Sequence, residues 1–218
     1  MKKDFWIEKW QNNQIGFHQD FTHPLLIEYI NKLGISIGDT IFVPLCGKSI
    51  DMLWLNNQGF NVIGIELSDL AIEQFFAENK LEYVKSTDKL FDVYSYENIT
   101  IYQGDFFALA PKHTIDVKAI YDRAALIALP GGLVEKYVEH MYALMPKNTS
   151  ELLITLELQR ATDVLGPPFS SPDKKVHDLF ASFTSIKLLQ MDDIVQKEEA
   201  FKKQGCEYVY ERVYLINF

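Results

Sequence analysis

Residues 40–66 decide the fold, and they read TIFVPLCGKSIDMLWLNNQGFNVIGIE. Residues 41–43 are a short apolar run of strand-forming types, and Pro44 ends that run because proline cannot donate to a sheet ladder. Apolar residues then recur at helical spacing until the Asn-Asn-Gln-Gly sequence of residues 56–59 ends the helix. Residues 62–65 form a second apolar run. The stretch therefore predicts a strand, a turn, a helix and a buried strand.

The turn and the tip of the second strand carry a binding signature. Gly47 lets the backbone turn tightly, and Glu66 stands at the strand end, 20 residues after Cys46. A nucleotide-binding βαβ unit places its ribose ligand at about this distance. The stretch has no GxGxxG and no GxxxxGK[ST], so a cofactor without phosphates is favoured, of which S-adenosylmethionine (SAM) is the common example. The alternative is an ordinary βαβ unit with an exposed acid at a strand end.

Composition limits the class of protein. The chain has 218 residues, 48% hydrophobic and 23% charged, with a formal net charge of −9 and no basic run, so nucleic acid is disfavoured as a partner. Two distant cysteines, Cys46 and Cys206, favour a reducing compartment over a disulfide framework. No secretory segment or membrane-span-length apolar run is present. We expect a soluble, cytoplasmic protein whose residues 1–218 form one domain.

An aromatic N-terminal arm, residues 1–35, precedes the first strand. Helices are predicted over residues 4–10 and 25–33. Two alternatives fit the arm. It packs on the sheet edge, as scattered aromatic residues commonly do, or it is a lid that presents Trp10 and Phe17 to the ligands, since a sulfonium cation favours aromatic faces.

Strands and helices alternate along the rest of the chain. Further strands are predicted at residues 99–102, 117–121, 152–158, 185–191 and 208–218. Further helices are predicted at residues 68–79, 133–145, 173–183 and 192–204, and residues 81–96 are a polar loop with an edge hairpin. This order predicts an α/β fold with a doubly wound, mostly parallel, seven-stranded sheet, helices on both faces and a C-terminal antiparallel strand pair.

Four side chains stand at the carboxyl ends of predicted strands: Cys46, Glu66, Asp105 and Arg123. Ligands of such sheets bind beyond these ends, so the four are expected to meet at one crevice. Asp105 is placed to bind an adenine amino group, with Phe106 against the ring. The alternative is a polar turn followed by core phenylalanines.

The sequence resembles the thiopurine S-methyltransferase family, in its bacterial form, nearly from end to end. The motifs that carry the resemblance are WIEKW (6–10), IGFH (15–18), PLCGK (44–48), GIE (64–66), DRAAL (122–126) and GPPF (166–169). The resemblance implies a class I SAM-dependent methyltransferase that transfers methyl to the sulfur of aromatic or heterocyclic thiols and releases S-adenosylhomocysteine. It also implies a monomer with a small-molecule acceptor.

The resemblance also implies which residues bind the cofactor and the acceptor. SAM contacts fall on Trp10, Leu45, Glu66 and Arg123, with further contacts from the Asp105-Phe106 turn. Phe17 matches a residue that borders the acceptor. One departure concerns the last helix, where some members use a basic residue toward the acceptor and this chain has Ala200.

Arg123 is the candidate catalytic residue, because its cation can stabilise an anionic acceptor and hold the cofactor carboxylate. A thiolate is a strong nucleophile, so no dedicated base is required. The alternative for Arg123 is a salt bridge to Asp122 or Glu66. Cys46 is not expected to act as a nucleophile. His18 and His23 are expected at the surface or as helix caps, and the histidine spacing predicts no metal.

Three other functions remain as alternatives. The first is methylation of selenium or tellurium compounds for detoxification, which changes the acceptor but keeps the fold. The second is a non-catalytic SAM-binding module. The third, a nucleotide-dependent oxidoreductase, is disfavoured by the missing dinucleotide glycines.

Overall fold

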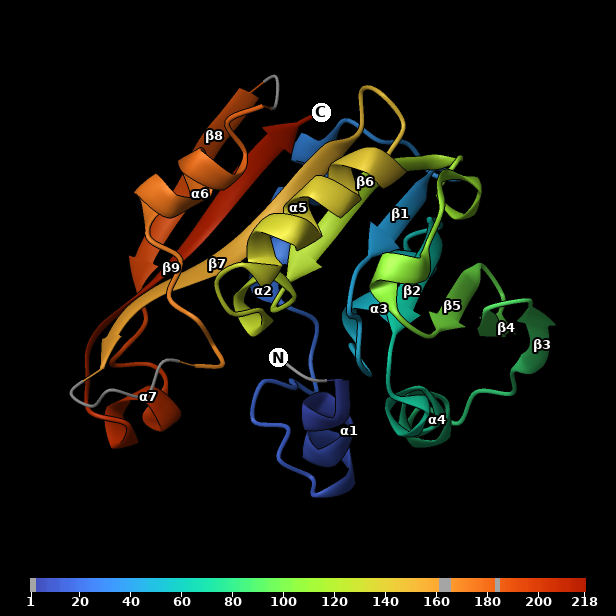
Figure 1. Cartoon of the computed structure of the whole chain (residues 1–218), viewed down its shortest axis with the longest axis horizontal. Helices are drawn as coiled ribbons and strands as arrows, with labels where there is room; N and C mark the ends of the chain where they lie inside the picture. Colours follow the sequence, from blue (N-terminus) through green and yellow to red (C-terminus); the bar gives the residue numbers. More distant parts are fainter. Residues whose placement is uncertain (1–2, 161–165, 183–184) are drawn as a thin grey trace.

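A computed structural model describes residues 3–160, 166–182 and 185–218 (Figure 1). Across these ranges nine strands form one sheet, in the order β3-β4-β5-β2-β1-β6-β7-β9-β8. The five central strands run parallel, and both edges are antiparallel. The central strands are β5 (Ile99–Gln103), β2 (Asn61–Glu66), β1 (Thr40–Val43), β6 (Val117–Arg123) and β7 (Ser150–Arg160). The edge strands are β3 (Val84–Asp88), β4 (Phe91–Tyr96), β9 (Cys206–Asn217) and β8 (Ser185–Asp193).

The predicted fold class is confirmed, but the sheet of the described residues has nine strands instead of seven. The hairpin expected within residues 81–96 forms β3 and β4, and it joins the sheet. β4 pairs with β5 from Asp92 opposite Gln103 to Tyr96 opposite Ile99. The hairpin extends the sheet because Phe91 and Tyr94 are buried, so its pairing is supported by burial as well as by backbone hydrogen bonds.

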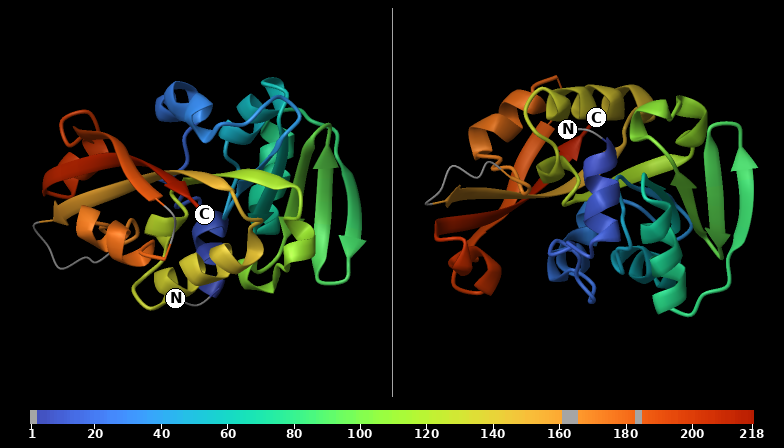
Figure 2. Two further views of the ribbon diagram at one scale, coloured as in Figure 1. Left: turned by 90° about the horizontal axis from the view of Figure 1, so that it is seen from above. Right: turned by 60° about the horizontal axis from the view of Figure 1, so that its bottom comes forward.

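Helices cover both faces of the sheet (Figure 2). One face carries α5 (Leu133–Leu144) and α6 (Asp173–Leu179). The other carries α2 (Pro24–Tyr29), the short helix η1 (Ile30–Leu33), α3 (Asp51–Asn57) and α4 (Asp69–Glu78). Successive side chains of β1 point to opposite faces of the sheet and so contribute to a hydrophobic core on each face. Phe42 packs on the α5 side, and Ile41 and Val43 pack on the α3 side.

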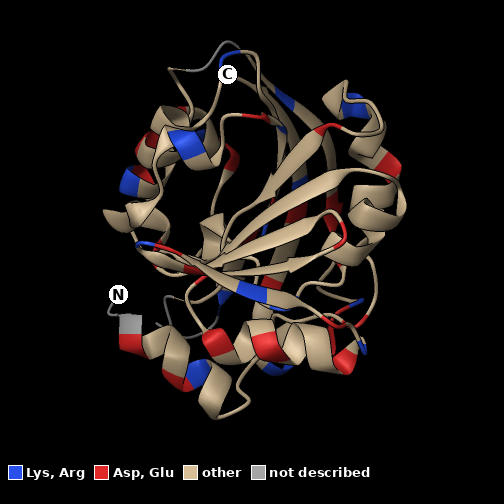
Figure 3. Cartoon of the chain, turned by 90° about the vertical axis from the view of Figure 1, so that its right-hand side faces the viewer, with Lys and Arg blue, Asp and Glu red and all other residues tan. Residues whose placement is uncertain are grey.

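Helix α1 (Lys3–Gln11) lies beyond the carboxyl ends of the parallel strands, beside α4 (Figure 1). The single-turn helices η2 (Phe106–Ala108), η3 (Pro111–His113) and η4 (Leu126–Ala128) follow β5 and β6. Residues of both charges occur along α1, whereas the charged residues of α4 are all acidic (Figure 3). Among the helices described, none combines the length and the apolar character needed to cross a membrane.

The predicted helix over residues 192–204 is mostly wrong. Asp192 and Asp193 belong to β8, and α7 spans only Glu199–Lys203. The Asp193 carboxylate explains the difference, because it accepts hydrogen bonds from the backbone N–H groups of Val195 (3.0 Å) and Val209 (3.2 Å). These bonds fix a turn where a helix would otherwise begin, since an Asp side chain competes with helical hydrogen bonding.

Candidate functional site

Four neighbouring strands carry the residues expected at the crevice, but of these four residues Cys46 and Arg123 line the cavity found there and Glu66 and Asp105 do not. The order β5-β2-β1-β6 brings Asp105, Glu66, Cys46 and Arg123 to one edge of the sheet. A cavity of about 50 Å³ opens there. Its walls come from three segments: the N-terminal arm, the turn after β1 and the end of β6.

Left-handed backbone conformations shape two of these walls. Leu45 (φ 45°) and Gly47 (φ 54°) lie in the turn after β1, and Ala124 (φ 66°) follows β6. Leucine and alanine rarely adopt this region, and such residues concentrate at binding sites. At Gly47 the missing side chain also matters, because a Cβ there would lie 3.0 Å from the Trp10 ring. The turn and the arm are therefore in close contact.

Glu66 is buried, with 6% of its surface exposed, and both of its oxygens are used by the backbone. Gly47 N–H donates to Oε2 (2.9 Å) and Ser68 N–H donates to Oε1 (2.8 Å). Burial raises the pKa of this carboxyl, although the backbone N–H bonds act in the opposite direction. Each carboxylate oxygen keeps lone-pair capacity for one more donor, as the two hydroxyls of a ribose require.

The first part of the arm, α1 and the loop that follows it, lies across the strand ends, whereas α2 and η1 pack on a face of the sheet (Figure 1). Trp10 is 4% exposed, and its ring meets the Phe17 ring edge-on at a centroid distance of 5.6 Å. Trp6 contacts Phe17 in the same way at 5.5 Å. Trp10 and Phe17 both line the cavity. Two aromatic faces are thus held beside the turn after β1.

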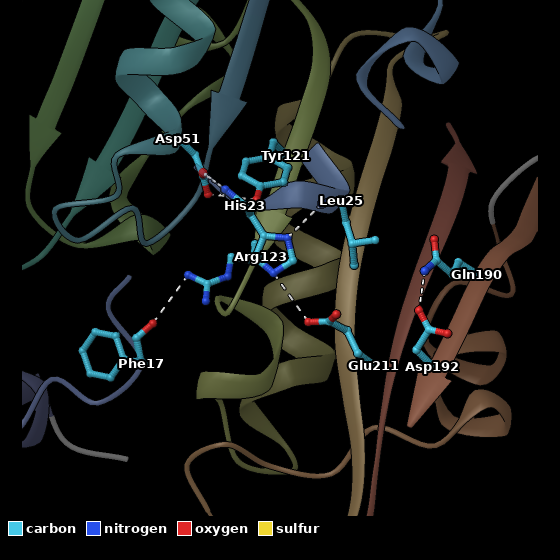
Figure 4. Close-up of polar contacts among 9 residues, drawn as sticks. All are labelled: Phe17, His23, Leu25, Asp51, Tyr121, Arg123, Gln190, Asp192 and Glu211. Carbon is cyan, nitrogen blue, oxygen red and sulfur yellow. Dashed lines mark hydrogen bonds and ion pairs between the residues drawn. The ribbon is translucent and has the colours of Figure 1, made fainter. Parts of the chain in front are cut away.

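Arg123 ends β6 and reaches toward the arm (Figure 4). Its Nη1 donates to the Phe17 carbonyl oxygen at 3.5 Å. The alternative salt bridges are not formed: Asp122 accepts from the Tyr137 hydroxyl (2.6 Å), and Glu66 accepts from backbone N–H groups. No carboxylate oxygen of a described residue is recorded within 4.0 Å of the Arg123 guanidinium. This cation is therefore open to an anionic ligand.

The Asp105-Phe106 turn differs from the expectation that placed Phe106 against an adenine. Asp105 accepts a hydrogen bond from Phe107 N–H (3.1 Å) and starts η2. Phe106 is 3% exposed and packs against Tyr137 and His140, at centroid distances of 4.9 and 5.1 Å. Neither residue lines the cavity beside Arg123. The core alternative describes Phe106, because the α5 side chains fill the space around its ring.

A buried polar network that the sequence did not indicate ties the arm to the sheet (Figure 4). Tyr121 hydroxyl donates to Asp51 Oδ2 (2.9 Å), and His23 backbone N–H donates to Asp51 Oδ1 (2.8 Å). His23 Nε2 lies 3.5 Å from a Glu211 oxygen on β9. His23 is a helix cap, as predicted, because its Nδ1 accepts from Leu25 N–H (3.3 Å). Such long-range pairs have no local sequence signal.

His18, Gln19 and Lys48 are among the other polar residues that line the cavity. His18 is half-buried and lines the cavity, and it caps no helix in the described chain. Gln19 Oε1 is buried without a hydrogen-bond partner in the described parts of the chain. Lys48 is buried and its Nζ pairs with Glu78 at 2.6 Å. The IGFH motif (15–18) could have indicated His18 as a site residue, because His18 directly follows Phe17, which was expected to border the acceptor.

Cys46 is buried, and burial followed by the nearby Glu66 charge raises the pKa of its thiol well above the usual value. Such a thiol is a poor nucleophile, which agrees with the expectation for this residue. A Cβ at Gly64 would lie 2.9 Å from Cys46 Sγ, so the Cys46 side chain fills the space between strand and helix.

The GPPF loop lies beside η4, where Phe169 N–H donates to the Ile127 carbonyl (2.7 Å).

The fold is that of class I SAM-dependent methyltransferases. It is similar to 1,6-didemethyltoxoflavin-N1-methyltransferase from Burkholderia thailandensis, solved with S-adenosylhomocysteine, with a TM-score of 0.64, 10% identity, and coverage of 99% of this chain and 87% of that chain. It is also similar to an arsenic(III) S-adenosylmethionine methyltransferase from Chlamydomonas reinhardtii, with a TM-score of 0.59, 13% identity, and coverage of 84% and 66%.

Sequence comparison gives the family. Residues 1–217 match the profile of the thiopurine S-methyltransferase family. Thiopurine S-methyltransferases from Pseudomonas paraeruginosa and Shewanella frigidimarina are each 41% identical to this chain, over 216 and 217 residues. The alignments cover 99% of this chain in both cases, and 99% and 98% of the two relatives. The chain belongs to the thiopurine S-methyltransferase family and is a SAM-dependent methyltransferase, as its motifs predicted.

Proposed function

We propose that this enzyme transfers the methyl group of SAM to the sulfur of aromatic or heterocyclic thiols, with a free small molecule as acceptor. The observation that carries the proposal is Arg123, which lines the cavity together with Phe17 and whose guanidinium has no carboxylate partner in the described chain. A flat, anionic sulfur acceptor suits both groups, since one is aromatic and the other is a permanent cation.

The residues at the strand ends suit the adenosyl group. Glu66 has lone pairs for the ribose hydroxyls, Leu45 and Trp10 supply apolar surface, and Gln19 Oε1 is a buried acceptor that still needs a donor. Bound SAM supplies a methyl group made electrophilic by its sulfonium. The protein's own contribution is to align the acceptor and keep water out, which can lower the barrier by roughly 7–11 kcal/mol.

Arg123 acts in two ways in this proposal. Its charge favours the thiolate over the thiol, which lowers the pKa of the bound acceptor. Its fork of donors also suits the carboxylate of the cofactor. It does not remove the proton itself, because the guanidinium holds no acceptor site.

The arm of residues 1–35 is proposed to be a lid on a single domain of residues 1–218. A cavity of about 50 Å³ is far smaller than the roughly 300–1,000 Å³ that small-molecule sites occupy, so the arm must move for ligands to enter. We also propose that the protein is a cytoplasmic monomer. Gel filtration with light scattering tests the oligomeric state.

A methylation screen tests the function. Purified protein is incubated with methyl-labelled SAM and matched acceptors: benzenethiol, 6-mercaptopurine, benzeneselenol, tellurite and phenol. S-Methyl products from the two thiols are expected, with phenol unmodified, because oxygen is a harder nucleophile and is protonated at neutral pH. Methylated selenium or tellurium in the absence of S-methyl products would favour the detoxification alternative. Binding of SAM with no methylated product would favour the non-catalytic one.

A further inference from the structure

We propose that His18 is the base that accepts the thiol proton of the acceptor, which lets the enzyme methylate thiols too weakly acidic to ionise alone. The inference rests on the proposed thiol acceptor. It departs from the expectation that no base is needed, and it begins from the position of the side chain: His18 lines the same cavity as Arg123 and Phe17.

The backbone holds His18 beside the Arg123 guanidinium. His18 N–H donates to the Ile15 carbonyl (2.8 Å), which closes a turn just before the residue. Arg123 Nη1 donates to the carbonyl of Phe17, the preceding residue. A sulfur that lies against the Phe17 ring and close to Arg123 therefore lies in the same small space as the imidazole.

His18 differs from the other four histidines, all of which the structure describes. Neither ring nitrogen of His18 has a recorded hydrogen-bond partner among the described residues. The other four lie outside the cavity lining. His23 bonds Leu25 and pairs with Glu211, His113 bonds Ala110 and Asp88, and His177 pairs with Asp173. His140 packs against Phe106 and Phe107, and its buried Nε2 also lacks a hydrogen-bond partner in the described chain. His18 alone combines a place in the cavity with open ring nitrogens in this part of the molecule.

Burial and the nearby charges together favour the neutral form of the His18 imidazole. Burial is the largest influence and lowers the pKa, and the charges of Lys48 and Arg123 lower it further. Glu78 and Asp20 act in the opposite direction, and the net pKa lies below its usual value. A neutral imidazole at pH 7 is able to take a proton, and the lowered pKa also favours its later release to water.

The other titratable groups that line the cavity are unsuited to this role. Both oxygens of Asp51 already accept hydrogen bonds, from Tyr121 and from His23. Burial raises the pKa of Cys46 and of Tyr121 well above their usual values, so both stay protonated. Lys48 is a cation paired with Glu78. His18 is left as the neutral acceptor.

The proton and electron balance is simple. The S–H bond breaks and its proton passes to a ring nitrogen of His18, while the electron pair stays on sulfur. That pair forms the new C–S bond as the methyl–sulfonium bond breaks, and the pair of the broken bond remains on the donor sulfur. The imidazolium then gives its proton to water, and Arg123 keeps its charge throughout.

The test compares His18→Asn with the matched control His177→Asn, whose side chain is 48% exposed on α6. Two acceptors are used: 4-nitrobenzenethiol, which is ionised at neutral pH, and phenylmethanethiol, which is not. Loss of a general base lowers kcat/KM by about 100-fold or more. We expect that loss for phenylmethanethiol, a change of less than about 3-fold for 4-nitrobenzenethiol, and no change with His177→Asn. Equal losses on both thiols, or no loss, would overturn the inference.

A second readout needs no turnover. Benzenethiol is bound to protein saturated with S-adenosylhomocysteine, and the thiolate band is followed by ultraviolet absorbance as pH is varied. Wild type should show bound thiolate at lower pH than free thiol does. His18→Asn and His18→Gln should keep only the part of that shift that the Arg123 charge supplies, while binding S-adenosylhomocysteine normally. An unchanged thiolate band in both variants would overturn the inference. If the wild type methylates neither thiol, the proposed function fails before the role of His18 is tested.

Discussion

The backbone N–H of Gly47 donates to the Glu66 carboxylate over 2.9 Å, so the turn after β1 is hydrogen-bonded to the tip of β2. Ser68 N–H holds the other oxygen. One carboxylate therefore fixes the shape of the turn and keeps lone pairs that a ribose would use. Binding and local structure depend on the same side chain.

Glu66→Gln should weaken S-adenosylhomocysteine binding by roughly 10- to 100-fold, because hydrogen bonds to a charged group contribute about 1.5–3 kcal/mol. The amide keeps the size of the side chain but sets an NH₂ group against a backbone N–H. Isothermal titration calorimetry measures the affinity. Glu82→Gln, at an exposed position, is the control. An affinity equal to wild type would show that Glu66 shapes the turn without binding the ligand.

Gly47→Ala should lower the free energy of unfolding by about 1–2 kcal/mol, because its φ of 54° is unfavourable for any residue with a Cβ. The new methyl would also lie 3.0 Å from Trp10 and push the arm away from the turn. Chemical denaturation measures the loss. Gly131→Ala is the matched control, since a Cβ there meets no heavy atom within 4 Å. Equal stability of the two variants would contradict the packing of the arm on the turn.

Arg123→Ala should lower kcat/KM by about 100-fold for phenylmethanethiol and by about 10-fold or less for 4-nitrobenzenethiol, because a nearby cation shifts an acceptor pKa by about 1–3 units. Steady-state kinetics at pH 7 give both values. Arg123→Lys keeps the charge and should recover part of the activity. If both thiols lose activity equally, Arg123 only holds the cofactor or the arm.

The buried carboxyl of Glu151 leads us to expect that the stability of the fold decreases as the pH rises above the usual carboxyl pKa. It lies on β7, 1% exposed, and its Oε2 has no hydrogen-bond partner in the described chain. Burial and then the Asp122 charge raise its pKa well above the usual 4.5. Burial also raises the pKa of Asp122 from 3.8 to about 6. Carboxyls with raised folded-state pKa values stabilise the fold below their unfolded pKa and lose that contribution as pH rises.

Glu151→Gln should therefore be more stable than wild type above pH 6, by roughly 2 kcal/mol at pH 8, with the gap closing toward pH 4. Urea denaturation at pH 4, 6 and 8 measures it. The exposed residue Glu139 provides the control variant Glu139→Gln, which should follow the wild-type curve. If the stability difference between Glu151→Gln and wild type instead grew as the pH fell, the pKa of Glu151 would not be raised in the folded state.

The strand-end residues were predictable because their signals are local. Glu66 and Arg123 each follow a short apolar run, and parallel strands gather their carboxyl ends at one edge. The start of the helix predicted from residue 68 is also set locally, since the Ser68 side chain accepts a hydrogen bond from Ala71 N–H within one turn. Spacing along the chain was sufficient in all these cases.

Other features depend on contacts between distant residues, and spacing does not encode those. Asp51 meets Tyr121 across 70 positions, so the tie between arm and sheet had no sequence pattern. Phe106 points into the α5 core because of packing that a turn motif does not reveal. The charged run of residues 192–204 suggested a helix, but the hydrogen bonds of Asp193 give the chain a turn there.

The position of β9 constrains how the molecule is made. β9 leaves the ribosome after every other strand of the sheet, yet it lies between β7 and β8 and pairs with both. During synthesis, β8 has no sheet partner and the eleven-residue β7 keeps an open edge. Glu211, which pairs with His23, is also on β9. The His23–Glu211 contact between the arm and the sheet therefore forms only after translation has delivered this strand, and the nascent chain is exposed to edge-to-edge aggregation until then.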